Sequence, residues 1–248
     1  MLTGKNVVVT GCSRGIGLSI LEQFADNGAS VIANSRSLSE LKAATSHLKN
    51  CICISGDVTV PAEANNLIIE ATKYNKSIDV LVCNVGSGAS VPPGEETLDD
   101  WHSMFSKNFY SCINVIQAAK PFLSAGSSIV CVSSICGKEV IPSAPIAYSC
   151  AKAALNFYVK AASHHLGQIG IRINAVVPGN VLFDGSVWDK KLKSNYIEVK
   201  KNIESEVPLS TFASPLDIAE TVMWLSGNNA KFITGSLLTV DGGQTRSL

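Results

Sequence analysis

Tyr148 and Lys152 are the first residues whose types and spacing suggest chemistry in this chain of 248 residues. They stand four positions apart in a segment with helical periodicity, so their side chains share one helix face. A free tyrosine has a pKa of about 10, and an adjacent ammonium group favours the phenolate and lowers that pKa. Tyr148 is therefore a candidate acid and base for a carbonyl or alcohol oxygen. The same spacing also occurs in ordinary amphipathic helices.

A serine favours the chemical interpretation of this pair. Ser134 follows an apolar strand upstream of Tyr148, where its hydroxyl can hydrogen-bond the same substrate oxygen. The four histidines show no ligand spacing, and the eight cysteines lack the paired C-x-x-C pattern of a zinc site. We expect no metal, and we interpret the cysteines as reduced thiols that mostly serve packing.

A second candidate site is the glycine-rich stretch TGCSRGIG at residues 10–17, between an apolar run and a predicted helix. Gly11 permits a tight turn, Gly15 lets the backbone approach a pyrophosphate, and Gly17 lets the helix pack close to the strand. Unpaired N–H groups at a helix start bind anions. Many α/β proteins also place glycine there for packing alone.

Short apolar runs alternate with helical patterns along the chain, which predicts an α/β fold: a single doubly wound Rossmann-type domain, 1–248, with a parallel seven-stranded sheet and helices on both faces. The predicted strands are Asn6–Thr10, Ser30–Ala33, Cys51–Ser55, Ile78–Cys83, Ser128–Val132, Ile171–Val176 and Leu237–Val240. The predicted helices are Gly15–Asn27, Leu38–Lys49, Pro61–Tyr74, Asp100–Phe122, Tyr148–Gly167 and Pro215–Ser226.

Residues 179–212 do not follow this alternation, because they are mostly polar. They come directly after a strand end. Ligands of open α/β sheets bind at that edge, so we interpret this insert as a lid over the substrate. Twenty basic and twenty acidic residues give no net charge, which argues against nucleic-acid binding. The N-terminal residues run directly into a strand and no apolar run is long enough to span a bilayer, so we expect a cytoplasmic protein without membrane attachment.

Seven motifs in register make the chain resemble the short-chain dehydrogenase/reductase family over nearly its full length, and in particular its 3-oxoacyl-acyl-carrier-protein reductase-like members. They are TGCSRGIG (10–17), DV (57–58), CNVG (83–86), Asn108, the pair Ser133 and Ser134 before YSCAK (148–152), PGNV (178–181) and VDGG (240–243).

The resemblance implies a role for each matching residue. Ser134 would polarise a substrate carbonyl, Tyr148 would be the general acid in reduction, Lys152 would also hold the nicotinamide ribose, and Asn108 would complete a proton relay through a water. Ser133 is the less favoured alternative to Ser134, because the family's serine directly precedes x-x-Gly, here Ile135-Cys136-Gly137. The implied cofactor-binding residues are Gly11, Ser13, Arg14, Gly15, Ile16, Gly17, Ser35, Arg36, Asp57, Val58, Asn84, Gly86, Tyr148, Lys152, Pro178, Gly179 and Val181.

The end of the second strand favours NADP(H) over NAD(H). Enzymes that use NAD commonly carry an acid there for the ribose 2′-hydroxyl, whereas this chain reads Asn34-Ser35-Arg36-Ser37. Arg36 and Arg14 suit a 2′-phosphate that is bound through guanidinium groups. The other interpretation is two solvated surface arginines.

Three features depart from the family pattern. CNVG replaces the usual NNAG, and Phe183 stands where a threonine often contacts the nicotinamide carboxamide. Ala125 and Ile169 replace basic residues that meet an acidic carrier in related acyl-carrier-protein reductases.

The sequence predicts an NADP(H)-dependent oxidoreductase that interconverts a ketone and a secondary alcohol of a small-molecule substrate. The alternative is a catalytically silent dinucleotide-binding sensor or scaffold. In the family the two long helices, Asp100–Phe122 and Tyr148–Gly167, usually pack against another subunit, so we expect a homotetramer or homodimer.

Overall fold

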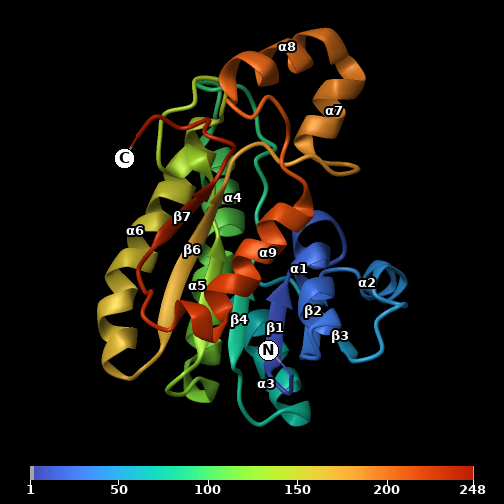
Figure 1. Ribbon diagram of the computed structural model, residues 1–248, viewed down its shortest axis with the longest axis vertical. Helices are drawn as coiled ribbons and strands as arrows, with labels where there is room; N and C mark the ends of the chain where they lie inside the picture. The colour runs from blue at the N-terminus through green and yellow to red at the C-terminus, as the bar shows by residue number, and fades with distance from the viewer. Residues whose placement is uncertain (1–2, 248) are drawn as a thin grey trace.

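Seven parallel strands form one sheet in the computed structural model, which describes residues 3–247 (Figure 1). Met1, Leu2 and Leu248, the ends of the predicted domain, lie outside the described residues. The sheet order is β3-β2-β1-β4-β5-β6-β7. The strands are β1 (Asn6–Thr10), β2 (Ser30–Ser35), β3 (Cys51–Ser55), β4 (Val80–Cys83), β5 (Ser128–Val132), β6 (Arg172–Pro178) and β7 (Leu237–Val240).

Helices cover both faces of the sheet, because successive strand side chains point to opposite faces and both sets are apolar. On β1, Val8 packs into the cluster formed with α3 (Pro61–Tyr74), α5 (Ser111–Ala119) and α6 (Ile146–Gln168). Val7 and Val9 pack into the opposite cluster with α1 (Gly15–Asp26), α2 (Leu38–Ala44) and α9 (Pro215–Ser226). Each fully buried Val, Leu or Ile in these clusters contributes about 1.5–3 kcal/mol. This arrangement confirms the predicted doubly wound α/β fold.

The predicted helix Asp100–Phe122 is wrong as a single continuous α-helix. It begins earlier, as α4 (Leu98–Phe105), because Thr97 and Asp100 form a capping box. A π-helical turn, Ser106–Tyr110, then leads into α5, and a 3₁₀ turn at Lys120–Phe122 ends the run. Turns of the π type often lie at functional sites, and this one carries Asn108.

The segment 179–212 contains two helices that the sequence did not predict, α7 (Val187–Ser194) and α8 (Tyr196–Glu206). Ser186 and Asn195 cap their first turns by accepting hydrogen bonds from Asp189 N and Glu198 N. In Figure 1 both helices stand above the edge of the sheet at which the strands end.

The strand order reverses between β1 and β4, so the connections leave the sheet in opposite directions there. Such a point leaves a crevice outside the carboxyl ends of the strands, which is where open α/β sheets bind ligands. Within residues 3–247, no helix is long and apolar enough to cross a membrane.

Candidate active site

The glycine turn after β1 has the geometry that its sequence predicted. Gly11 and Gly15 have φ angles of +70° and +57°, a region that residues with a Cβ rarely adopt. A Cβ on Gly17 would lie 2.1 Å from Gly11 O, so the helix packs against the turn at a distance that only glycine allows. No side chain of residues 3–247 caps α1, which leaves its first N–H groups, including that of Ile16, available to an anion.

Asn84 holds this turn in place. Its Nδ2 donates to Thr10 O at 3.1 Å and to Gly11 O at 3.0 Å. Its backbone N donates to Thr10 Oγ1, which in turn donates to Val82 O. The carboxyl ends of β1 and β4 are thereby joined through two side chains. Sequence reasoning assigned Asn84 to the cofactor and missed Thr10, although Thr10 begins the TGxxxGxG motif.

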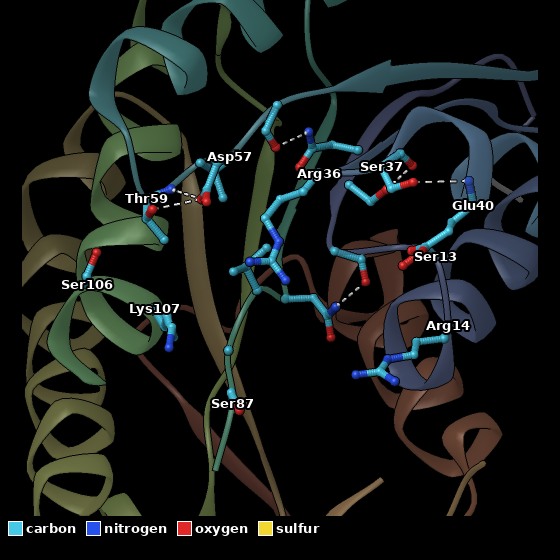
Figure 2. Close-up of a pocket in the computed structure, with 18 of the residues that line it drawn as sticks. Ser13, Arg14, Arg36, Ser37, Glu40, Asp57, Thr59, Ser87, Ser106 and Lys107 are labelled. Atoms are coloured by element: carbon cyan, nitrogen blue, oxygen red, sulfur yellow. Dashed lines mark hydrogen bonds between the residues drawn. The ribbon is translucent and has the colours of Figure 1, made fainter. Parts of the chain in front are cut away.

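A cavity of about 1180 Å³ opens beside the turn (Figure 2). Nine predicted cofactor-binding residues line it: Gly11, Ser13, Arg14, Ser35, Arg36, Asp57, Val58, Asn84 and Gly86. Figure 2 shows the Arg36 side chain extending into the cavity, between the wall that carries Asp57 and Thr59 and the wall that carries Arg14. Glu40, an acid that the sequence analysis did not weigh, also lines it. The structure brings both arginines to one cavity, and Arg14 Nη1 also approaches Gly185 in the segment after β6.

The wall at Asp57 and Val58 is fixed by local hydrogen bonds. Asp57 Oδ1 accepts from the backbone N and the hydroxyl of Thr59, at 3.0 and 2.7 Å. Asn114, on α5, donates from Nδ2 to the carbonyl oxygens of Val58 and Thr59, both at 3.1 Å. Sequence reasoning missed Asn114, because a lone polar residue on a helix carries no signal of this contact.

Ser134 and Tyr148 meet at the carboxyl end of β5. Ser134 lies two residues after β5 ends at Val132 and caps the 3₁₀ turn Ile135–Gly137, accepting from Cys136 N at 3.2 Å. The Ser134 hydroxyl lies near the Tyr148 phenol and acts to lower its pKa. Ser133 instead donates its N–H to Val176 O, and its hydroxyl has no partner within the described structure. The structure thus brings Ser134, and not Ser133, to Tyr148.

Burial raises the pKa of Tyr148, and the neighbouring Cys136 adds to this rise while the nearby Ser134 hydroxyl opposes it. The direction is opposite to the lowering expected from Lys152. The physical reason is that desolvation of the phenolate dominates, and that Lys152 Nζ donates to Val132 O at 2.9 Å. Tyr148 is therefore a neutral phenol at neutral pH in this structure.

Lys152 is 3% exposed, and burial lowers its pKa from 10.5 to about 8. It packs closely against two glycines. A Cβ on Gly86 would lie 3.1 Å from Lys152 Nζ and 2.8 Å from Asn108 Oδ1. A Cβ on Gly137 would lie 2.5 Å from the Lys152 carbonyl carbon. Gly86 and Gly137 therefore give Lys152 the space that it occupies, a requirement that the sequence did not reveal for Gly137.

Asn108 lies next to Lys152 and is 1% exposed. Its Oδ1 accepts from Ser87 N at 2.9 Å, and its Nδ2 donates to Ser87 O and Met104 O at 3.0 Å. The side chain thus ties the π-helical turn to the loop after β4. Asn108, Ser134, Tyr148 and Lys152 gather at the carboxyl edge of the sheet as the sequence predicted, although none of the four lines the 1180 Å³ cavity.

The segment after β6 closes the other side of the site. Gly179 N donates to Val240 O, and Val181 pairs with Ala213. The Phe183 ring lies against Gly15, where a Cβ would be 2.5 Å from the ring. Gly88 covers the Tyr148 ring, since a Cβ there would lie 3.7 Å from it. Outside the cavity lining lie Gly15, Ile16, Gly17, Tyr148, Lys152, Pro178, Gly179 and Val181.

Comparison with known proteins identifies the class to which this fold and site belong. Residues 11–245 match the family model described as enoyl-(acyl carrier protein) reductase. The 3-oxoacyl-[acyl-carrier-protein] reductase of Chlamydia trachomatis is 32% identical over 98% of both chains. A tropinone reductase homolog of Arabidopsis thaliana is also 32% identical, over 98% of this chain and 93% of its own.

The fold is also similar to those of solved structures with a bound dinucleotide. A short chain dehydrogenase from Burkholderia cenocepacia in complex with NADP has a TM-score of 0.90 at 28% identity, with 98% of both chains covered. A blue fluorescent protein from a metagenomic library in complex with NADPH has a TM-score of 0.90 at 29% identity, with 98% and 99% covered. The chain belongs to the short-chain dehydrogenase/reductase family of oxidoreductases.

Proposed function

We propose that this protein is an NADP(H)-dependent oxidoreductase that interconverts a ketone and a secondary alcohol on a small-molecule substrate. The observation that carries the proposal is the assembly of Ser134, Tyr148 and Lys152 at the carboxyl edge of the sheet, beside a cavity lined by arginine and serine side chains. Both the reacting groups and the anion-binding groups stand where an α/β sheet binds a dinucleotide.

The residues of the cavity fit the nucleotide end of NADP(H). The first turn of α1 offers N–H groups to the pyrophosphate, and Arg14 and Arg36 offer guanidinium groups to the 2′-phosphate. Asn34 also lines the cavity, and its buried Oδ1 has no hydrogen-bond partner in the described structure. This oxygen can accept a hydrogen bond from the adenosine part of the cofactor. When bound, the nicotinamide supplies or accepts the hydride.

Side chains of the protein transfer the proton to the carbonyl oxygen of the substrate. Tyr148 holds its proton at neutral pH, which is the form required to protonate a carbonyl oxygen during reduction. Ser134 is placed to donate a hydrogen bond to the same oxygen and so to polarise the carbonyl. As Tyr148 loses its proton, the nearby Lys152 ammonium favours the phenolate. Asn108 positions the loop at Ser87 and lies beside Lys152. This position supports a role for Asn108 in the relay that delivers protons to Lys152.

The substrate is proposed to bind under the segment 179–212, which acts as a lid of a single domain. The names of the two relatives, one a tropinone reductase homolog and one a carrier-protein reductase, support a ketone substrate in general. Ala125 and Ile169, at the positions where the carrier-protein reductases have basic residues, favour a free metabolite over an acidic carrier.

We propose a homodimer or homotetramer in the cytoplasm, without nucleic-acid or membrane partners. Phe157 on α6 is 77% exposed, Leu98 on α4 is 77% exposed, and Tyr110 and Ile146 are also exposed. Apolar side chains of this size gather at subunit interfaces more often than on solvated surfaces. A monomer by light scattering at micromolar concentration would overturn this part of the proposal.

The alternative, a silent dinucleotide-binding sensor or scaffold, makes an opposite prediction for Tyr148→Phe. This variant keeps the ring that packs under Gly88 and removes only the hydroxyl. If the protein is an enzyme, NADPH affinity stays at the wild-type value while ketone reduction falls by about 10²–10⁴-fold. Tyr158→Phe, on the same helix, is the matched control and should reduce ketones at the wild-type rate. NADPH binding with no turnover of any ketone by the wild type would instead support the scaffold.

A further inference from the structure

Three cysteine side chains from different elements meet inside the core. Cys83 ends β4, Cys131 is its register partner on β5, and Cys112 lies on α5, which packs over that face of the sheet. All three are buried, with exposed fractions of 4%, 0% and 4%. Cys112 Sγ and Cys131 Sγ are 3.4 Å apart, and all three sulfur atoms lie within 4.8 Å of one another.

We propose that Cys83, Cys112 and Cys131 form a binding site for one Cu(I) ion with three thiolate ligands. A metal held by three sulfur atoms at about 2.3 Å in one plane sets those atoms about 4 Å apart. The Cys112–Cys131 separation is 3.4 Å and no pair exceeds 4.8 Å, so shifts of under about 1 Å, which side-chain rotations supply, are enough to form the site.

The ligand set selects the ion. Soft thiolates favour Cu(I), zinc or iron–sulfur clusters over hard ions such as Mg²⁺ and Ca²⁺. Structural zinc almost always takes four ligands in a tetrahedron. Among residues 3–247, no histidine, aspartate, glutamate or further cysteine joins the three sulfur atoms. Three sulfur ligands in an apolar core therefore favour a soft ion that is satisfied by three thiolates.

A cation lies close to the cluster. Lys152 Nζ donates to the carbonyl oxygen of Val132, which directly follows Cys131 on β5. A buried anionic copper–thiolate group would otherwise be costly, because isolated charges are poorly solvated in the core. Lys152 thus offers compensating charge from the side of the proposed active site.

The position of the cluster links it to that site. Cys112 follows Asn108 by one helical turn, and Cys83 directly precedes Asn84. The sequence gives no sign of the cluster, because the three cysteines lie far apart in the chain and only the β4–β5 pairing and the packing of α5 bring them together. The expectation of no metal rested on local spacing alone. The copper site is independent of the proposed reductase activity.

The test is an anaerobic titration of the fully reduced protein with Cu(I) supplied as its coloured bicinchoninate complex, followed until the absorbance is constant. We expect wild type to remove one equivalent of Cu(I) and to gain an ultraviolet sulfur-to-copper charge-transfer band. Cys112→Ala and Cys131→Ala should lose both signals. Cys12→Ala, a buried cysteine in the opposite core cluster, and Cys150→Ala, an exposed one, should keep both.

Failure to withdraw copper by the wild type would overturn the site, as would equal binding by a Cys112→Ala variant that has the wild-type circular dichroism spectrum. X-ray absorption of copper-loaded wild type gives a second measurement that does not depend on any variant folding. Three sulfur neighbours at one distance support the site. Two sulfur neighbours, or nitrogen and oxygen neighbours, show that copper binds elsewhere and overturn it.

Discussion

At the carboxyl ends of β1 and β2 the site is an open cavity, whereas at β5 and α6 the reacting side chains are packed under other residues. The nucleotide end is shaped by the glycine turn and by short polar side chains, with Arg36 and Arg14 reaching in from its walls. At the reaction end Gly88 lies over the Tyr148 ring, while Phe183 packs against Gly15 of the glycine turn. The packed end therefore supplies the desolvation that shifts the pKa values of Tyr148 and Lys152.

Removal of Lys152 tests the packed end and carries the largest expected effect. In Lys152→Met, the buried methylene chain is largely retained while the ammonium is lost. We expect ketone reduction to fall by about 10²–10⁴-fold, because the developing Tyr148 phenolate loses its compensating charge. Steady-state kinetics with NADPH give the number. Lys160→Met, at an exposed position on the same helix, is the control, and an equal loss there would assign the effect to helix stability instead.

Removal of Arg36 tests the open end. Because a charge-assisted hydrogen bond is worth about 1.5–3 kcal/mol, Arg36→Ala should weaken NADPH binding by about 10- to 100-fold and leave NADH binding unchanged. Titrations followed by nicotinamide fluorescence measure both affinities. Arg14→Ala should also weaken NADPH binding. Lys73→Ala, which removes an exposed ion-paired lysine on α3, should leave both affinities unchanged. If wild type binds NADH as tightly as NADPH, the 2′-phosphate assignment is wrong.

The pH dependence of the reduction rate and of NADPH affinity compares the two ends of the site. Lys152 is charged below its pKa of about 8, so the reduction rate should be level below that pH and fall about tenfold per unit above it. NADPH affinity should change little over the same range, since arginine stays protonated. A rate that stays level to pH 10 would contradict the role of Lys152.

The titration of Lys152 does not destabilise the fold above about pH 8, so it cannot lower the reduction rate by unfolding the protein. Its folded pKa is lower than the unfolded value of 10.5, so between about pH 8 and 10.5 the unfolded chain binds more protons. The contribution of Lys152 to the free energy of unfolding therefore increases with pH in that window. Thermal melts across the same range separate the two effects.

The sequence predicted the strands and the glycine turn well, because both depend on local patterns of apolar residues and glycines. It predicted that Ser134, Tyr148 and Lys152 would lie together, because Tyr148 and Lys152 share one helix face and Ser134 follows an apolar strand. It did not predict the rise in the pKa of Tyr148, since burial by Gly88 and the loop after β4 depends on tertiary packing. The π-helical turn at Asn108 and the Asn84–Thr10 contacts are likewise long-range results.

Phe183 packs against the glycine turn, and its replacement has the smallest expected effect. The ring lies against Gly15, beside the proposed cofactor position, so Phe183→Thr should remove bulk and add a hydroxyl that can hydrogen-bond the bound cofactor. One neutral hydrogen bond is worth about 0.5–1.5 kcal/mol, which corresponds to a two- to tenfold gain in NADPH affinity before any cost of lost ring packing. Isothermal titration measures the gain, and Phe183→Leu, which keeps apolar bulk without a hydroxyl, is the control. A weaker affinity in Phe183→Thr together with wild-type affinity in Phe183→Leu would show that apolar contact at this position, and not a hydrogen bond, helps to hold the cofactor.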